Sequence, residues 1–327
     1  MNRTCLSRRA VLAHAALLAA SPLFAQTGDW PKGPVRFIVP GPSGGVMDRL
    51  LRIVQPSLQT ALGQPVVIEY KAGANSIIGI DAVAKAAPDG QTWGIAPSSA
   101  IAINPVIVPK MPYDAEKDLA AVAQFGAAGV LLVANPSTGF KSLQDMVAYA
   151  KANPGKLSYA SWGNGSTGHL VMEGIKAHYK VFMPHIPYRT TAQALTDLLG
   201  GTITVGFLDI ASPIPHVQAG RLVALGASGS SRGPALPNLP TLSEQGFKFE
   251  ADGWLGIFAP ANTPPAIVTR MNQEIGKILA VEDTKQKFLA QNMTLPPFKT
   301  SAQFATIVKA DTETWQSMAK TANLKMD

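Results

Sequence analysis

Cysteine and charged residues are scarce in this chain, and each scarcity excludes a class of function. The one cysteine, Cys5, precedes an N-terminal apolar run, so the rest of the chain can form no disulfide and no cysteine metal site. Only 15% of the residues are charged against 46% that are hydrophobic, a balance that excludes a disordered chain. Lysine and arginine are scattered without a basic stripe, so nucleic acid is not an expected partner. Beyond the N-terminus no apolar run is long enough to span a bilayer.

The N-terminal residues have the pattern of an export signal rather than of a folded element. Arg8 and Arg9 precede the apolar run 10–20, and Ala25 supplies the small residue expected before a cleavage site. The paired arginines fit the twin-arginine route, and an ordinary secretory signal with two chance arginines fits equally well. Removing residues 1–25 takes away three arginines and no acid, which lowers the formal net charge from +7 to +4. We therefore expect a periplasmic protein with a slight preference for anionic small molecules.

Strand and helix patterns alternate along the remaining chain, which indicates an α/β fold with mixed sheets flanked by helices. The length of 327 residues is enough for two domains with their own cores. We expect two lobes, the first made of residues 26–128 plus 249–327 and the second of residues 129–248. The predicted strands are 35–39, 66–70, 93–96, 130–133, 157–160, 203–207, 223–227 and 254–259. The predicted helices are 46–62, 77–86, 143–151, 167–179, 191–199, 265–279 and 302–319.

The glycine-rich stretch Ser161–Leu170 lies between a predicted strand and a predicted helix. Such a loop directs unpaired backbone N–H groups of the helix start towards one point, which suits an anion. His169 falls in the first turn of that helix, where it contacts a ligand or, as we favour, holds the loop by a hydrogen bond. Trp162 sits inside the loop and is the aromatic residue that we expect to line a ligand site, although Trp254 and Tyr188 are also candidates.

The same stretch also matches the dinucleotide fingerprint G-x-G-x-x-G from Gly163 to Gly168. The acidic residue expected about 20 positions later is missing, and Arg189 in that region could meet a 2′-phosphate instead. An NADP-dependent oxidoreductase is therefore an alternative, and a glycine turn without a ligand is another. We favour a small-anion site, because an exported protein rarely meets nicotinamide cofactors.

A second loop of this kind, residues 40–48, joins the first predicted strand to the first predicted helix. Its glycines free N–H groups where the helix dipole favours negative charge. Ser43 adds a hydroxyl, and Asp48 follows one turn into the helix as a ligand contact or simply as a favourable N-terminal charge. The loop lacks the G-K-[ST] sequence that holds nucleoside triphosphates. Two such loops far apart in the sequence suggest one anionic ligand held from two sides.

Catalytic and metal-binding patterns are poor. The histidines at positions 169, 178, 185 and 216 show no metal spacing. Asn164 occupies the first glycine position of the G-x-S-x-G pattern around Ser166, so there is no nucleophile elbow. We therefore expect neither an enzyme nor a metal site nor a cofactor.

With these residues in hand, the chain resembles the Bug family, the substrate-binding proteins of tripartite tricarboxylate transporters. The resemblance covers nearly all of the chain after the export signal and is most specific in segments 153–170 and 88–92. It implies a two-lobed periplasmic binding fold of type II topology that closes on a small carboxylate, a dicarboxylate or an aromatic acid. It also implies a membrane permease or a sensor as partner, and we expect the receptor to be a monomer.

The resemblance implies ligand contacts in both loops without an arginine clamp. The contacts carried over to this chain are Ser43, Gly44, Gly45, Ser161, Asn164, Gly165, Ser166 and Thr167. Ser98 and Ser99 follow the third strand and would face the same cleft, and Asp209 would select the far end of the ligand. The chain departs from the family at Gly41, where an aromatic residue is usual, and it gains Trp162. These departures alter the expected pocket wall.

Overall fold

The computed structural model describes residues 30–210, 212–229, 232–233, 235–249, 253–291 and 293–321. Two compact units divide the chain, Met1–Trp30 and Pro31–Asp327. Only Trp30 of the first unit is described, so the fold below is that of the second unit. The predicted export signal, residues 1–25, lies outside the described residues.

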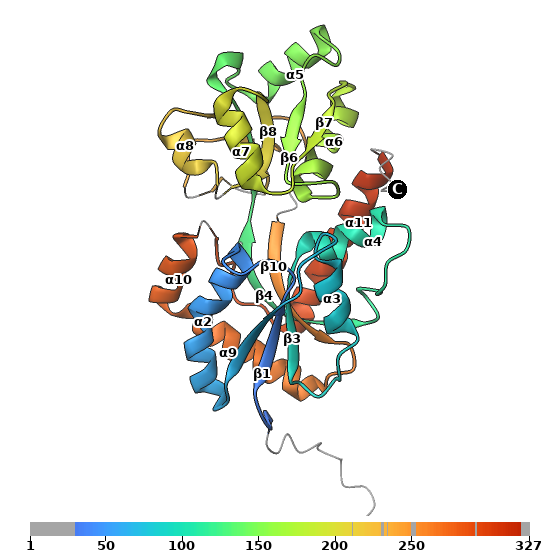
Figure 1. Ribbon diagram of the computed structural model, residues 1–327, viewed down its shortest axis with the longest axis vertical. Coiled ribbons are helices and arrows are strands. Elements are labelled where there is room, and N and C mark those ends of the chain that lie inside the picture. The colour runs from blue at the N-terminus through green and yellow to red at the C-terminus, as the bar shows by residue number, and fades with distance from the viewer. Residues whose placement is uncertain are drawn as a thin grey trace, which may run out of the picture. The chain divides into compact units, whose positions relative to one another are not determined.

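Ten strands form two five-stranded sheets (Figure 1). Sheet A has the order β2-β1-β3-β10-β4, and sheet B has the order β7-β6-β8-β5-β9. The strands of sheet A are β1 (Val35–Val39), β2 (Val66–Tyr70), β3 (Thr92–Pro97), β4 (Leu119–Ala128) and β10 (Gly253–Pro260). The strands of sheet B are β5 (Val130–Ala134), β6 (Tyr159–Ser161), β7 (His185–Pro187), β8 (Val205–Asp209) and β9 (Val223–Ala227).

The two sheets repeat one topology. In sheet A, β2, β1 and β3 run parallel, and β10 pairs antiparallel with both β3 and β4. In sheet B, β7, β6 and β8 run parallel, and β5 pairs antiparallel with both β8 and β9. The antiparallel strand of each sheet is the first strand after the chain leaves the other sheet. β5 of sheet B follows β4 of sheet A, and β10 of sheet A follows β9 of sheet B. The fold is therefore the two-lobed, type II arrangement that the sequence predicts.

Helices cover both faces of each sheet. Those associated with sheet A are α2 (Val46–Leu62), α3 (Ile77–Ala84), α9 (Pro265–Ala280), α10 (Glu282–Leu289) and the first half of α11 (Ser301–Thr321). The π-helix η1 (Ser99–Ile103) and α4 (Asn104–Ile107) follow β3, and their residues Ala102, Ile103 and Ile107 pack in the core of sheet B. Those associated with sheet B are the 3-10 turn η2 (Pro136–Thr138), α5 (Leu143–Ala152), α6 (Thr167–Tyr179), α7 (Thr191–Gly200) and α8 (Ile214–Gln218). The alternation along β5 shows the two-faced packing, because Leu132 faces the core under α5 and α6, whereas Leu131 and Val133 face α7.

Helix α2 shows how the sequence builds an element that carries the site. Leu50, Leu51, Val54 and Leu58 are buried on one face, as the helical spacing requires. Gly63 ends the helix in the left-handed region at φ 67°, and its amide binds the carbonyl oxygen of Gln59. The predicted bounds of α2, α6 and three strands (β1, β2 and β9) agree with the structure.

Helix α11 connects the two cores. Its first half packs against sheet A through Phe304, which lies in a cluster with Trp254 and Phe258. Near its end, Trp315 is fully buried in the core of sheet B, with its ring against that of Phe249 at a centroid distance of 5.2 Å. The helix therefore belongs to both halves of the unit.

Candidate functional site

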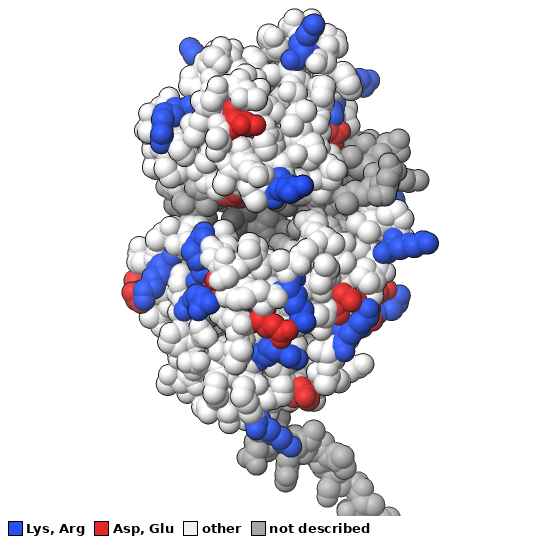
Figure 2. Space-filling view, in the orientation of Figure 1, with Lys and Arg blue, Asp and Glu red and all other residues white. Residues whose placement is uncertain are grey.

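A cavity of about 290 Å³ is lined by residues of both sheets and their helices. Figure 2 shows a hollow in the surface between the upper and lower halves of the view. The wall includes the ends of the parallel strands β1, β3 and β8 and the first residues of α2, α6 and α7. The carboxyl ends of parallel strands and the helix starts that follow them are where α/β folds bind ligands. The two glycine-rich loops therefore meet at one cavity.

The loop before α2 is a tight turn that ends in a helix start. The amide of Gly45 donates to the carbonyl oxygen of Pro42 at 3.1 Å, and Gly44 adopts φ +76°, as the third residue of a type II turn requires. Asp48 then reaches back from the third residue of the helix, and its Oδ2 accepts the amide of Gly44 at 2.6 Å. Ser43 donates to the same oxygen at 3.5 Å.

The loop between β6 and α6 repeats this arrangement. The amide of Ser166 donates to the carbonyl oxygen of Gly163 at 3.2 Å, and Gly165 adopts φ +72°. His169, again the third residue of its helix, accepts the amide of Gly165 on Nδ1 at 3.1 Å. The equivalent glycine amides, Gly44 and Gly165, thus bind side chains of the helices that follow them and are not free for a ligand.

The first amides of both helices remain as donors. Within the described residues, the amides of Val46 and Met47 in α2 and of Thr167 in α6 have no acceptor, as expected for the first turn of a helix. All three residues line the cavity. Together with the hydroxyls of Ser98 and Thr167, they offer neutral donors to an anion from the two sides.

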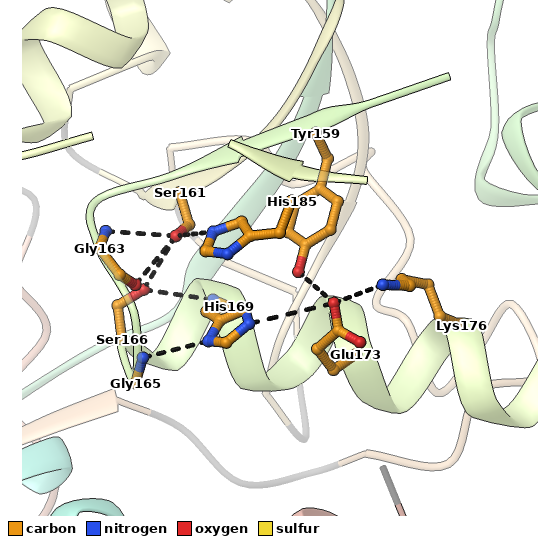
Figure 3. Close-up of polar contacts among 9 residues, drawn as sticks. All are labelled: Tyr159, Ser161, Gly163, Gly165, Ser166, His169, Glu173, Lys176 and His185. Atoms are coloured by element: carbon orange, nitrogen blue, oxygen red, sulfur yellow. Dashed lines mark hydrogen bonds and ion pairs between the residues drawn. The ribbon is translucent and has the colours of Figure 1, made fainter. Parts of the chain in front are cut away.

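A polar cluster behind the α6 loop fixes its shape (Figure 3). Ser161 Oγ lies 2.8 Å from Nε2 of His185, and it accepts the amide of Gly163 at 3.2 Å and the hydroxyl of Ser166 at 3.3 Å. The hydroxyl of Ser166 caps the helix by accepting the amide of His169 at 3.2 Å. The rings of His169 and His185 stack with centroids 4.1 Å apart. Loop, strand and helix are therefore joined by side chains.

Glu173 closes the cluster on the side away from the loop (Figure 3). Its Oε1 accepts the hydroxyl of Tyr159 at 2.5 Å and the ammonium of Lys176 at 2.6 Å. Nε2 of His169 lies 4.0 Å from the same oxygen. Because Nδ1 of His169 accepts the amide of Gly165, the neutral ring carries its proton on Nε2, facing Glu173. Protonation of Nδ1 would break this bond to the loop.

The two stacked imidazoles predict a loss of stability in acid. Burial lowers the pKa of His185 from 6.5 to about 3, and the neighbouring charges of His169 and Lys176 act in the same direction. Burial also lowers the pKa of His169. The unfolded chain takes up these protons near pH 6.5, whereas the folded chain does so only at lower pH, so the free energy of unfolding falls as the pH drops from about 6.5 towards 3.

We expect His185→Phe, which keeps a ring between Tyr159 and His169, to flatten this pH dependence. Urea unfolding between pH 7 and pH 4.5 measures the slope. The matched control is His178→Phe, which removes an imidazole from the same lobe outside the cluster and should retain the wild-type slope. Equal slopes for wild type and His185→Phe would contradict the assignment.

The structure divides the predicted site residues into two groups. Six of them line the cavity: Gly45, Ser98, Ser99, Trp162, Thr167 and Asp209. The others do not: Ser43, Gly44, Asp48, Ser161, Asn164, Gly165, Ser166 and His169. Among these, Asp48 and His169 hold loop amides, Ser161 and Ser166 tie the loop to its strand, and Asn164 is exposed within the turn. The structure thus gives Asp48, Ser161, Ser166 and His169 positioning contacts, and the ligand contacts expected of the predicted site residues stay a prediction.

Sequence reasoning missed most of the apolar wall. Met47, Val130, Ile210, Leu255 and Met293 line the cavity together with the two tryptophans Trp162 and Trp254. Thr191 and Gln291 add polar groups that were also not predicted. The sequence holds one signal for this wall: several of these residues lie directly beside a predicted strand end or loop. Tyr188 is not part of this wall, since its hydroxyl binds Asp197 at 2.7 Å.

The described residues hold neither a metal-binding cluster nor a membrane-spanning helix. No three histidine, aspartate or glutamate side chains among them come together as metal ligands would. None of the helices in the described part of the chain has the length and apolar composition of a membrane span.

Comparison with known proteins identifies the family. The family described as "Tripartite tricarboxylate transporter family receptor" matches residues 50–324. Protein BugT of Bordetella pertussis is 34% identical over 309 residues, which cover 94% of each chain. A UPF0065 protein from the tcbD-tcbE intergenic region of a Pseudomonas species is 34% identical over 317 residues, covering 96% of this chain and 94% of its own.

Solved structures agree with this assignment. A protein described as a periplasmic transporter superposes with a TM-score of 0.81 at 32% identity, covering 91% of this chain and all of its own. Rpa4515 of R. palustris, solved with adipate, has a TM-score of 0.81 at 30% identity, with 91% and 99% of the chains covered. MatC from Rhodopseudomonas palustris, solved with bound malate, has a TM-score of 0.78 at 27% identity, with 88% and 99% covered.

These relationships do not support the alternative of an NADP-dependent oxidoreductase, and the loop explains why its motif is misleading. The amide of Gly165 already binds His169, and Gly168 is required by packing, because a Cβ there would lie 2.5 Å from the carbonyl oxygen of Phe207. Arg189 is exposed and does not line the cavity. The chain belongs to the tripartite tricarboxylate transporter receptor family, the Bug proteins, whose members bind solutes and are not enzymes.

Proposed function

We propose that this protein is a periplasmic receptor that captures a small organic carboxylate in the cavity between sheets A and B. One observation carries the proposal: the first residues of α2 and α6, one helix from each sheet, line the same cavity, and their amides have no acceptor in the described part of the chain. Helix N-termini stabilise a negative charge by about 0.3–2 kcal/mol each, so several must converge to hold a carboxylate. The adipate and malate in the two solved relatives support this ligand class.

We further propose that the two lobes comprise residues 26–128 plus 249–327 and residues 129–248, and that they close on the ligand by a hinge. The chain passes between sheets at Gly129 and again between β9 and β10, and both Gly129 and Gly253 line the cavity. The closed receptor would deliver its ligand to a membrane permease of the tripartite type or report it to a sensor. The strand content of each sheet supports these bounds, and the shared helix α11 would restrain the motion.

A thermal-shift panel of mono- and dicarboxylates, aliphatic and aromatic, tests the proposal. At least one carboxylate at 100-fold its Kd should raise the melting temperature by about 5–10 °C, because saturation at that level adds about 2.7 kcal/mol to stability. The corresponding uncharged amides and NADPH should produce no shift. Since neutral donors hold the anion, the Kd should rise only modestly between 50 mM and 500 mM salt. The proposal would be contradicted if only NADPH raised the melting temperature, or if none of the carboxylates did.

A further inference from the structure

The cavity wall is apolar over most of its extent. The rings of Trp162 and Trp254 and the side chains of Met47, Ile210, Leu255 and Met293 form much of it, beside a smaller set of polar side chains, Ser98, Ser99, Thr167, Thr191, Asp209 and Gln291. The indole nitrogen of Trp254 is already bound to Asp311. Such a wall favours a ligand whose body is a methylene chain or an aromatic ring, because apolar surface gains by leaving water. Its polar side chains are neutral apart from Asp209, so the described lining offers no cation to a second carboxylate.

Positive charge at the cavity is limited. No lysine, arginine or histidine stands among the described lining residues, or directly before or after any of them in the sequence. The starts of α2, η1, α6 and α7 reach the wall, and the positive ends of helices attract an anion. Asp48 in the first turn of α2 is paired with Arg52 at 2.9 Å, so its charge does not cancel the positive end of that helix.

Asp209 adds a fixed negative charge to the cavity. It ends β8 and lines the cavity beside Ile210, opposite Val130 in the strand pairing. Its carboxylate accepts the amide and the hydroxyl of Ser212, both at 3.0 Å, and no described cation contacts it. The helix starts can hold one carboxylate, but a second carboxylate near Asp209 would meet a like charge without a counter-ion.

Arg49 is the cation that contacts the wall from outside. Its Nε donates to the side-chain oxygen of Gln291 at 2.6 Å, and its Nη1 donates to the carbonyl oxygen of Gly44 at 2.5 Å. Arg49 is exposed and is not part of the lining. These two neutral oxygens do not cancel its charge, but they hold the guanidinium outside the lining, so it makes no direct ion pair inside the cavity.

From these observations we infer that the receptor selects organic acids with one carboxylate and an apolar body, and that Asp209 disfavours a second carboxylate. The inference rests on the proposed function and narrows it. The volume of about 290 Å³, at the lower end of the range for small-molecule sites, limits the body to a short chain or a single ring.

Matched ligand pairs test the selectivity by calorimetry. Hexanoate and adipate differ only in a terminal methyl against a carboxylate, and benzoate and benzene-1,4-dicarboxylate differ in the same way on a ring. In at least one pair, we expect the monocarboxylate to bind at least tenfold more tightly than its dicarboxylate. A third probe, 6-aminohexanoate, places an ammonium at the far end, where Asp209 attracts it, and should bind more tightly than adipate.

The variant Asp209→Asn tests the role of the carboxylate. Asparagine keeps a carbonyl oxygen for Ser212, so the turn after β8 should be retained. We expect this change to tighten adipate or benzene-1,4-dicarboxylate binding at least fivefold while changing monocarboxylate binding less than twofold. The matched control is Asp283→Asn on α10, which makes the same change of charge at a side chain that is 71% exposed, and it should alter neither affinity.

The outcomes separate this inference from the proposed function. Tighter binding of the dicarboxylate in both pairs would overturn the inference and leave the proposed function intact. Tighter binding of adipate than of 6-aminohexanoate would show that Asp209 does not act on the far end of the ligand and would also overturn it. Unchanged dicarboxylate affinity in Asp209→Asn would refute the role of Asp209. Failure of every carboxylate to bind would overturn the proposed function itself.

Discussion

Gly168→Ala is expected to destabilise the protein by about 3 kcal/mol and to weaken ligand binding more than tenfold. A methyl group at this second residue of α6 would lie 2.5 Å from the carbonyl oxygen of Phe207 in β8 and 2.6 Å from the ring of Trp162. Backbone cannot yield at low cost, so the helix start must move away from the strand. That movement displaces the amide of Thr167 and the Trp162 ring, both part of the cavity wall.

Urea unfolding and calorimetry with the best ligand of the panel measure the two effects. Gly200→Ala is the matched control, since the nearest atom to a methyl group there is Thr202 Oγ1 at 4.0 Å. Alanine should leave binding unchanged and stabilise the last turn of α7 by up to about 1 kcal/mol. Wild-type affinity in Gly168→Ala would show that the start of α6 has no part in binding.

Asp48→Ala is the second change with a large expected effect, about 3 kcal/mol of lost stability at pH 7. The Asp48 side chain is 2% exposed and accepts hydrogen bonds from Gly44 and from Tyr70 Oη at 2.9 Å, besides its ion pair with Arg52. Removing the acceptor leaves these donors unpaired next to the turn that positions α2. We therefore also expect weaker carboxylate binding, although Asp48 does not line the cavity.

The pH dependence of this effect gives a separate check. Burial opposes ionisation of Asp48, but the bonds from Gly44 and Tyr70 and the charge of Arg52 lower its pKa below the ordinary 3.8. The stabilisation is therefore present above about pH 3.8 and disappears as the pH falls through the lower folded-state pKa, so wild type and variant should converge there. Asp283→Ala, which breaks an exposed ion pair with Lys287, should cost less than about 0.5 kcal/mol. A loss of less than about 0.5 kcal/mol in Asp48→Ala would contradict the role given to Asp48.

Local sequence signals predicted the elements that carry the site. Helix α2 begins after Gly45 and ends at Gly63 as expected, because glycines mark both ends of a strongly amphipathic run. Helix α6 begins at Thr167 behind its Ser166 cap, also as expected. The strands before these helices are β-branched or buried and were recognised, although β6 lies one to two residues later than predicted.

Other elements depend on tertiary pairing and escaped prediction. Strand β4, Leu119–Ala128, is rich in alanine, which has little strand preference, and it is held as a strand by pairing with β10. Strand β7 has only three residues and includes Pro187 at the edge of sheet B. The π-helix η1 after Ser98 and the short helices α8 and α10 carry no strong periodic signal.

The same division applies to the site. The two glycine-rich loops could be recognised from sequence, because their glycines and caps are local features. The sequence does not reveal which groups those loops present to a ligand, because that depends on which amides are bound by Asp48 and His169. The apolar wall was equally inaccessible, because Ile210, Leu255 and Met293 come together only through the sheets.

Amide chemical shifts in the ¹⁵N-labelled protein test the central claim most directly, that one helix start from each sheet binds the same carboxylate. On saturation with the tightest monocarboxylate, the amides of Met47 and Thr167 should show large shifts of the kind that a new charged acceptor produces. Those of Gly44 and Gly165, which already bind Asp48 and His169, should move much less. Large shifts at only one of the two helices, or at neither, would contradict the account.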